Sequence, residues 1–176
     1  MNGRRFPLFA DLTGRSAVVV GGGAVGLRRA GVLARFGAVV TVVSPRLSGP
    51  AEGFRHLPRP YRTGDLEGAF LAVAAADDPA VNAAVGREAR RLGVLFNRAD
   101  CPAECGFIFP AVCEGSGLVA GLIGTEGDHR KTVRGAQAVR RALRELDEEE
   151  KNGSEDRNDS ADGGGAAAGG GVFHRE

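Results

Sequence analysis

The chain has 176 residues, enough for one domain with a hydrophobic core, or for one domain and a small appendage. Hydrophobic residues make up 43% of it, which is typical of a globular protein. It has no apolar run of about 18 residues, and its first residues lack the apolar centre of a signal peptide. We therefore expect neither a membrane span nor export, and a cytoplasmic location.

The net charge of +1 results from two oppositely charged regions. Residues 147–176 include nine acidic and three basic side chains, which leaves 20 basic and 13 acidic ones in residues 1–146. A basic body favours a polyanionic partner, such as a dinucleotide, a small molecule with several carboxylates or a nucleic acid, although solvated surface arginines give the same balance. Of these we expect a small-molecule partner, with no nucleic acid and no membrane.

The three cysteines, Cys101, Cys105 and Cys113, are an odd number without the spacing of a zinc finger. In a chain without an export signal they are expected to be reduced thiols. A metal site that combines them with His129 has little support from ligand spacing, so no metal site is predicted.

A glycine motif stands at the end of the first expected strand, a run of small and β-branched residues over 17–20. Gly21, Gly23 and Gly26 have the G-x-G-x-x-G spacing. In this spacing the first glycine permits a tight turn, the second lets the backbone approach a pyrophosphate, and the third allows close packing of helix on strand. A helix over 24–36 follows, and its unpaired N–H groups would face the same phosphates. The motif predicts a dinucleotide site, the alternative being a glycine-rich turn that binds nothing.

The second expected strand, over 38–43, leads into Ser44, Pro45 and Arg46. In many dinucleotide enzymes an acidic residue binds the ribose hydroxyls at this place, and none is present here. Arg46 is able to bind a 2′-phosphate instead, so the motif leaves NAD and NADP open. Over the whole edge of the sheet, the predicted cofactor-binding residues are Gly21, Gly23, Ala24, Val25, Gly26, Ser44, Pro45, Arg46, Ala75 and Ala76.

Strands and helices continue to alternate in the middle of the chain. A loop with at most one short strand, near 54–57, precedes a strand over 70–75 that ends in small residues, as a cofactor lying over it requires. Asp78 is able to cap a helix and Pro79 suits its first turn, so a helix is expected over 80–92, with a glycine after it.

Residues 94–97 complete the pattern as a further strand. The alternation predicts an α/β fold, a Rossmann-like doubly wound parallel sheet, on which the apolar segment 6–9 is expected to pack. The carboxyl ends of its strands would bring together the glycine turn, Ala76 and residues 97–100.

The pattern changes after Cys105. Short strands over 107–109 and 118–123, joined by 114–117, read as a hairpin, and a helix over 129–146 with Asp128 as its cap follows. A strand pair with one helix buries too little to fold alone, and a second copy of the chain is the economical partner, so we expect a homodimer.

The predicted organisation has three parts. An NAD-binding Rossmann domain spans 1–106, a small α+β dimerisation segment spans 107–146, and a disordered, acidic and glycine-rich tail spans 147–176.

Several motifs follow one another in a specific order. They are Phe6-Pro-Leu-Phe9 with Leu12, the glycine loop with Arg28-Arg29 after it, Val42-Val-Ser-Pro45, Ala72 to Asp78 with Asn82, Asn97-Arg-Ala-Asp100, and Phe107-Ile-Phe-Pro-Ala111. As a set they resemble the precorrin-2 dehydrogenase family, the NAD-dependent module of siroheme synthesis, over roughly residues 6–146.

The resemblance implies oxidation of precorrin-2 to sirohydrochlorin, with a hydride passing to NAD and a proton lost from the macrocycle. It implies that Asp100 is the catalytic carboxylate, and the chemistry agrees, because this loss needs a base within hydrogen-bond reach. The alternative for Asp100 is a loop aspartate that caps its own turn before Pro102.

The family's substrate carries eight carboxylates, which suits the basic body. The predicted substrate-binding residues are Asn97, Arg98, His129, Arg130 and Lys131. Family members commonly have a Ser-Pro pair where this chain has Asp128-His-Arg130, so that loop's details do not transfer. Two alternatives stay open: a bifunctional dehydrogenase and ferrochelatase, since some longer members insert iron, and a non-catalytic NAD(P)-sensing module.

Overall fold

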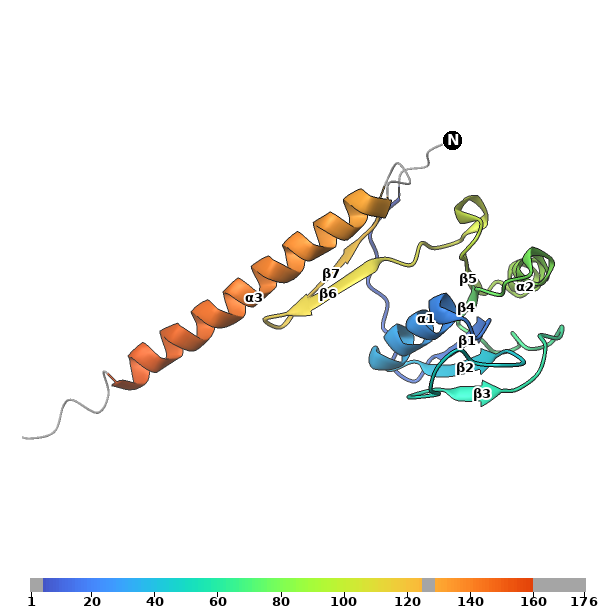
Figure 1. The fold of residues 1–176 in the computed structure, drawn as a ribbon, viewed down its shortest axis with the longest axis horizontal. Coiled ribbons are helices and arrows are strands. Elements are labelled where there is room, and N and C mark those ends of the chain that lie inside the picture. The colour runs from blue at the N-terminus through green and yellow to red at the C-terminus, as the bar shows by residue number, and fades with distance from the viewer. Residues whose placement is uncertain (1–4, 125–128, 160–176) are drawn as a thin grey trace, which may run out of the picture. The chain divides into compact units, whose positions relative to one another are not determined.

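The computed structural model describes residues 5–124 and 129–159. The chain divides into two compact units, one over Arg5–Phe109 and the other beginning at Pro110 (Figure 1). Each unit has its own sheet and its own hydrophobic cluster.

A five-stranded sheet forms the centre of the unit over Arg5–Phe109, with the strand order β3-β2-β1-β4-β5 and every neighbouring pair parallel. Its registers align Val20 with Val43 and Ala74, and Ala74 with Arg98, so four strands end at one edge. The order reverses between β1 and β4, the place where such sheets bind ligands. The predicted doubly wound α/β sheet is confirmed, with strands β1 (Ser16–Val20), β2 (Val39–Val43), β3 (Arg55–Leu57), β4 (Leu71–Ala74) and β5 (Leu95–Arg98).

Two helices cover the two faces of this sheet. Helix α1 (Ala24–Arg35) packs on the face that includes Val19, and α2 (Pro79–Leu92) packs on the face that includes Val18. Both valines are almost fully buried, because consecutive strand residues point to opposite faces and each face is covered. Burial of such a side chain stabilises the fold by about 1.5–3 kcal/mol.

The start and the end of α2 confirm the sequence signals. The Asp78 carboxylate accepts a hydrogen bond from the Ala80 N–H at 2.8 Å, and Pro79 is the first helical residue. Gly93 ends the helix with a φ of +70°, a conformation that glycine adopts without strain.

The N-terminal apolar segment differs from its prediction. Phe6, Leu8 and Phe9 do not pack on the sheet: their exposed fractions are 87%, 80% and 72%. Phe107 and Phe109 pack instead against the hydrophobic cluster between the sheet and α1. These two residues were predicted to belong to a strand and lie in irregular structure.

The unit that begins at Pro110 contains a hairpin and a long helix (Figure 1). Strands β6 (Ala111–Gly115) and β7 (Leu118–Leu122) pair antiparallel around Ser116 and Gly117, whose φ angles of +48° and +65° suit a tight two-residue turn. The helix α3 (His129–Asp159) covers one face of this hairpin. The hairpin was expected, but its first strand lies four to six residues later than 107–109.

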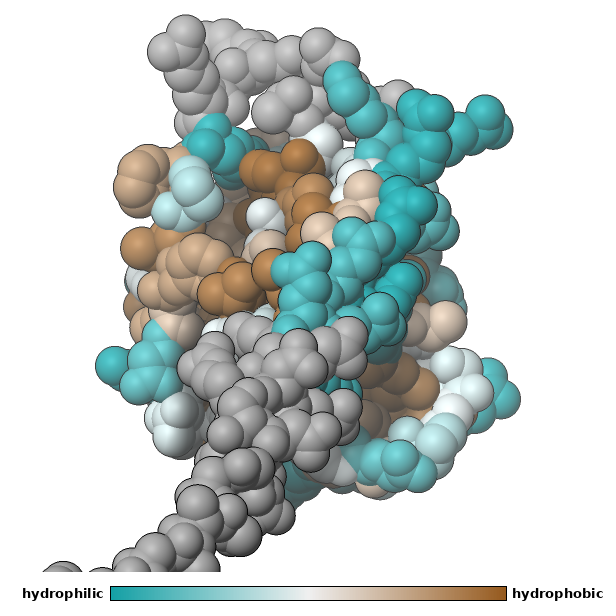
Figure 2. All heavy atoms as spheres, turned by 90° about the vertical axis from the view of Figure 1, so that its left-hand side faces the viewer, coloured by the Kyte–Doolittle hydropathy of each residue, from teal (hydrophilic) through white to brown (hydrophobic). Residues whose placement is uncertain are grey.

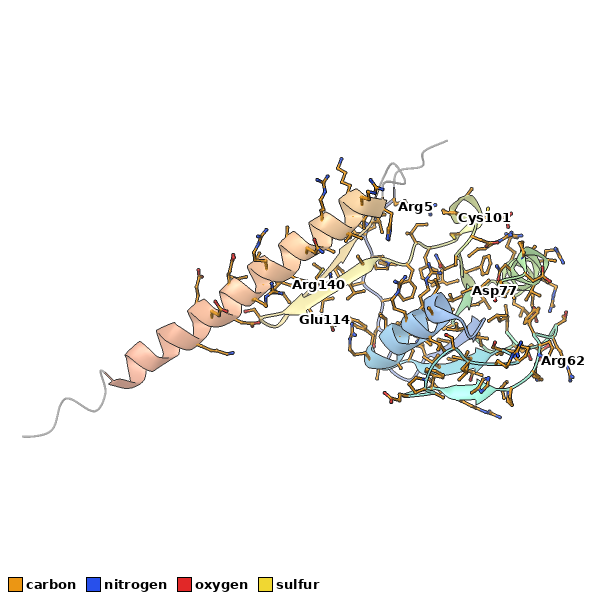
Figure 3. The ribbon with its side chains drawn as sticks, in the orientation of Figure 1. Arg5, Arg62, Asp77, Cys101, Glu114 and Arg140 are labelled. Atoms are coloured by element: carbon orange, nitrogen blue, oxygen red, sulfur yellow. The ribbon has the colours of Figure 1, made fainter. Side chains whose placement is uncertain are left out.

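A small hydrophobic cluster holds α3 against the hairpin in this second unit. Ala136 and Leu143 of α3 are buried against Cys113 of β6. Arg140 reaches from the helix to the hairpin, where its Nη2 donates to the Val112 carbonyl at 2.8 Å (Figure 3). The cluster is small because a two-stranded sheet offers a single helix little area to bury.

Helix α3 continues to Asp159, whereas the sequence predicted its end at Leu146 and a disordered tail after it. The prediction weighed only the lack of apolar side chains after Leu146. Glu148, Glu149 and Lys151 have high helix propensity, and Arg144 and Glu148 are oppositely charged and spaced four apart. Asp128, predicted as the cap, and the rest of the tail, 160–176, lie outside the described residues. Among the described helices, none has the length and apolar character needed to cross a membrane.

Candidate functional site

The glycine turn after β1 requires three of its glycines, Gly21, Gly22 and Gly26, for packing alone. Gly21 has a φ of +117°, and a Cβ there would lie 2.3 Å from the Ala75 carbonyl oxygen. A Cβ on Gly26 would lie 2.1 Å from the Gly21 carbonyl oxygen. A Cβ on Gly22 would lie 2.2 Å from the Arg46 carbonyl oxygen. Side chains at these three positions would therefore collide with backbone, whatever the ligand.

Gly23 is different. It precedes α1 with ordinary backbone angles, φ −74° and ψ 173°, that any residue adopts. Among the described residues, apart from its chain neighbours and its own helix, no atom lies within 4 Å of the place its Cβ would occupy. The fold thus does not require glycine here, whereas a pyrophosphate approaching the backbone does.

The first turn of α1 completes this cradle. In the described chain, α1 begins without a side-chain cap and without an acidic residue in its first turn. Its N-terminal N–H groups and the positive end of its dipole are therefore available to an anion. The residues present fit the diphosphate of a nicotinamide dinucleotide, with Ala24 and Val25, both exposed, in the first turn.

The loop after β2 folds onto the glycine turn. Ser44 is buried, and its Oγ donates to the Arg46 carbonyl at 2.7 Å, while its own carbonyl lies 2.8 Å from His56 Nε2. The Ser48 N–H donates to the Gly22 carbonyl at 2.8 Å. The Ser44 hydroxyl therefore shapes the loop, and Pro45 and Arg46 beside it are exposed.

Asn82 of α2 holds the end of β4. It is buried, its Oδ1 accepts from the Ala76 N–H at 2.9 Å, and its Nδ2 donates to the Ala76 carbonyl at 2.9 Å. The Ala75 N–H donates to the Val20 carbonyl at 2.8 Å, which places these small residues beside the glycine turn. Asn82 was not predicted as a site residue; the available signal was an amide on the buried side of the helix over 80–92.

Asn97 of β5 connects three segments. Its Oδ1 accepts from Arg29 Nη1 of α1 at 2.6 Å, and its Nδ2 donates to the Phe107 carbonyl at 2.9 Å. Asn97 is 3% exposed, so it positions these segments and is not placed to contact a substrate as predicted. Arg29 lies over the Phe109 ring, and its burial lowers its pKa.

Asp100 lies in the loop after β5, at the same edge of the sheet as the glycine turn. The Ala99 N–H donates to the Ala74 carbonyl at 2.9 Å and so fixes the start of this loop against β4. The Asp100 side chain is 35% exposed. Hydrogen bonds from Arg98, and a further one from Asn82, lower the pKa of Asp100 below its ordinary value, so this carboxylate is ionised at neutral pH.

The predicted substrate-binding residues lie in both units. Arg98 is at the end of β5 and binds two carboxylates, Asp100 and Glu104. His129, Arg130 and Lys131 are exposed at the beginning of α3, in the unit that starts at Pro110.

The described cysteines do not form a metal site. Cys101 lies in the loop after β5, and Asp77 marks the loop after β4 (Figure 3). Cys105 is buried and Cys113 belongs to the other unit. Over residues 5–124 and 129–159 no group of three or more His, Cys, Asp or Glu side chains is arranged to hold a metal ion.

Comparison with known proteins gives consistent similarities. A family described as "Putative NAD(P)-binding" matches residues 8–111. The probable multifunctional siroheme biosynthesis protein HemA of Ruminiclostridium josui is 37% identical over 144 residues, which are 78% of this chain and 28% of that protein. The siroheme synthase of Azotobacter vinelandii is 46% identical over 122 residues, 66% of this chain and 26% of that protein.

A solved structure of SirC, precorrin-2 dehydrogenase, has a TM-score of 0.62 and 26% sequence identity, and the match covers 77% of this chain and 69% of that one. The resemblance drawn from the motifs is thereby confirmed. The chain spans little more than a quarter of the length of the curated relatives, 28% and 26%.

Proposed function

Because the chain belongs to this NAD(P)-binding family, we propose that it is a dehydrogenase of siroheme biosynthesis that oxidises precorrin-2 to sirohydrochlorin with NAD. The observation that carries the proposal is the meeting of two features at one edge of the sheet. One is the phosphate cradle at Gly23, which the fold itself does not need. The other is the ionised, partly exposed carboxylate of Asp100.

The reaction removes two hydrogens from the macrocycle. The oxidised nicotinamide ring supplies a hydride acceptor, and the second hydrogen leaves as a proton, so precorrin-2 and NAD⁺ give sirohydrochlorin, NADH and H⁺. Asp100 is the base that takes this proton. Its lowered pKa means that it is fully ionised before the step and passes the proton on to water readily, since the side chain is partly exposed.

The cofactor residues divide by their position along the edge. The α1 N-terminus with Gly23 binds the diphosphate, Pro45 and Arg46 lie at the ribose end, and the small side chains of Ala75 and Ala76 leave room beside the ring. The choice of NAD follows the family resemblance. Arg46 is the residue to replace when NAD and NADP are compared, because a 2′-phosphate would bind it.

The cations at the start of α3 suit a substrate with several carboxylates. His129, Arg130 and Lys131 are exposed, and we propose that they bind its acidic arms. Measurement of KM for precorrin-2 after neutralising Arg130 and Lys131 tests this assignment, and an unchanged KM would contradict it.

A second copy of the chain is the proposed partner of the unit that begins at Pro110. Its helix covers one face of the hairpin, and hydrophobic side chains stay exposed beside it, among them Leu118, Val119 and Ile123 (Figure 2). The buried cluster of Cys113, Ala136 and Leu143 is too small to stabilise a domain alone, so association would supply the missing burial.

The decisive experiment is anaerobic incubation of the chain with precorrin-2 and either NAD or NADP, following the absorbance of sirohydrochlorin. We expect turnover with NAD, and a loss of about 10²- to 10⁴-fold in kcat for Asp100→Asn with cofactor binding retained. Binding of NAD without turnover would contradict the dehydrogenase and favour a sensor. Addition of ferrous iron to the same reaction tests whether this chain also inserts metal.

A further inference from the structure

Within the loop after β5, the Arg98 side chain holds the Asp100 carboxylate. Arg98, the last residue of β5, donates from Nε to Asp100 Oδ1 at 2.8 Å and from Nη2 to Asp100 Oδ2 at 3.1 Å. Two parallel N–H···O bonds fix the plane of a carboxylate as well as its position, which a single bond does not. The orientation of Asp100 is therefore set by Arg98.

Arg98 is itself held in place. Its Nη1 donates to Glu104 Oε2 at 3.1 Å, and its Nη2 also reaches the Pro79 carbonyl at 3.4 Å. Its backbone N–H donates to Cys105 Sγ at 3.1 Å, and its side chain is 11% exposed. Because these contacts already fix the Arg98 side chain, it loses little further conformational entropy when it orients Asp100.

The charges at this place argue against the predicted contact of Arg98 with a substrate carboxylate. One positive guanidinium already faces the carboxylates of Asp100 and Glu104. A third carboxylate would have to displace one of them, because they already occupy the N–H groups of the guanidinium. Arg98 is thus engaged inside the protein.

We propose that Arg98 is a positioning residue of the dehydrogenase reaction, which holds the Asp100 carboxylate in the orientation that accepts the substrate's proton. This inference rests on the proposed function. In this proposal Arg98 does not bind the substrate, the role that the sequence predicted, but orients the Asp100 carboxylate.

The electrostatics give this task a second measurable readout. The hydrogen bond from Arg98 is the largest cause of the lowered pKa of Asp100. From α2, Asn82 adds an uncharged hydrogen bond to Asp100, while Arg90 reaches the cluster only through Glu104, 3.7 Å away. Loss of Arg98 therefore raises the pKa of Asp100, and the acid limb of the pH profile of kcat moves to higher pH.

The test compares Arg98→Met and Arg98→Lys with Arg90→Met, a matched control that removes an arginine from the same cluster without touching Asp100. For Arg98→Met we expect kcat to fall by about 10- to 100-fold, the acid limb to move to higher pH, and KM for precorrin-2 to change little. Arg98→Lys keeps the positive charge but loses the two parallel N–H bonds of the guanidinium. We therefore expect its acid limb to stay near that of the unmodified chain, while kcat is still reduced. Arg90→Met should leave kcat and the acid limb unchanged.

A raised KM for precorrin-2 with an unchanged kcat and acid limb would overturn the proposal in favour of substrate binding. If the unmodified chain does not oxidise precorrin-2, the proposed function fails, and the positioning role is still decided by carbon NMR of the aspartate carboxyl groups. With Asp100→Asn used to assign the signal, the Asp100 titration should move to higher pH in Arg98→Met and not in Arg90→Met. An Asp100 titration that is the same in both would refute the role of Arg98.

Discussion

The two units of the chain differ in how completely their sheets are covered. In the unit over Arg5–Phe109, five parallel strands have α1 on one face and α2 on the other, and each face contributes a cluster of buried residues. In the unit that begins at Pro110, α3 covers one face of a two-stranded hairpin, and Val119 of the hairpin stays exposed. The comparison teaches that the first unit has the burial needed to fold by itself, whereas the small buried cluster of the second is consistent with the second copy that we propose.

The largest expected effect tests the self-contained unit. Gly21→Ala places a Cβ 2.3 Å from the Ala75 carbonyl oxygen at a φ of +117°, so we expect a loss of about 2–6 kcal/mol in the free energy of unfolding. Urea denaturation measures it. The matched control is Gly23→Ala, which should unfold like the unmodified chain but bind NAD at least about tenfold more weakly. Equal stability of Gly21→Ala and Gly23→Ala would contradict the geometry.

The next effect concerns the core of the second unit. Leu143→Ala leaves a cavity beside Cys113, and a loss of about 2 kcal/mol or more is expected. Because a second copy is proposed to cover this unit, the melting temperature should rise with protein concentration, in the variant and in the unmodified chain alike. Calorimetry at two protein concentrations measures the stability loss and the shift in melting temperature. A melting temperature that does not change with concentration would argue against the partner.

A smaller effect tests which face the partner covers. Val119→Lys places a charge on the uncovered side of the hairpin, and we expect the dimer to dissociate about tenfold more readily, equivalent to about 1.4 kcal/mol. The control is Val39→Lys, a similar change at an exposed valine of the other unit, which should leave association unaltered. Sedimentation equilibrium distinguishes them. If the dissociation constant of the dimer is unaltered in Val119→Lys, the second copy does not contact this face of the hairpin.

The smallest effect is a pH dependence inside the first unit. Both Asp65 oxygens accept from Arg59, at 2.7 and 2.8 Å, and this pairing lowers the pKa of Asp65. The pair therefore contributes stability above the ordinary pKa of an aspartate, and this contribution is lost as the pH falls through the lowered value. Asp65→Asn should lower the free energy of unfolding by about 1 kcal/mol at pH 7. Below the lowered pKa of Asp65 the substitution should leave it unchanged. Denaturation curves at several pH values check this, and a cost that persists in acid would refute it.

The local elements could be predicted because their signals lie within a few residues. Gly21 and Gly26 set the turn after β1, and Asp78 with Pro79 sets the start of α2. By contrast, the apolar residues Phe6 and Phe107 gave no indication of which would pack on the sheet. That choice depends on tertiary contacts, such as the hydrogen bond from Asn97 to the Phe107 carbonyl, and hydrophobicity alone does not decide it.

The sequence by itself determined the parallel α/β sheet, the glycine turn and the family, because periodicity, turn residues and motif order are local properties of the chain. Only the tertiary structure decided what Asn97 and Arg98 contact. Asn97 is bound by Arg29, 68 residues earlier in the chain, and Arg98 is held by carboxylates, by Pro79 and by Cys105. A polar side chain at a strand end has many possible partners, and only the folded chain selects among them, since burial forces each polar group to find a hydrogen bond.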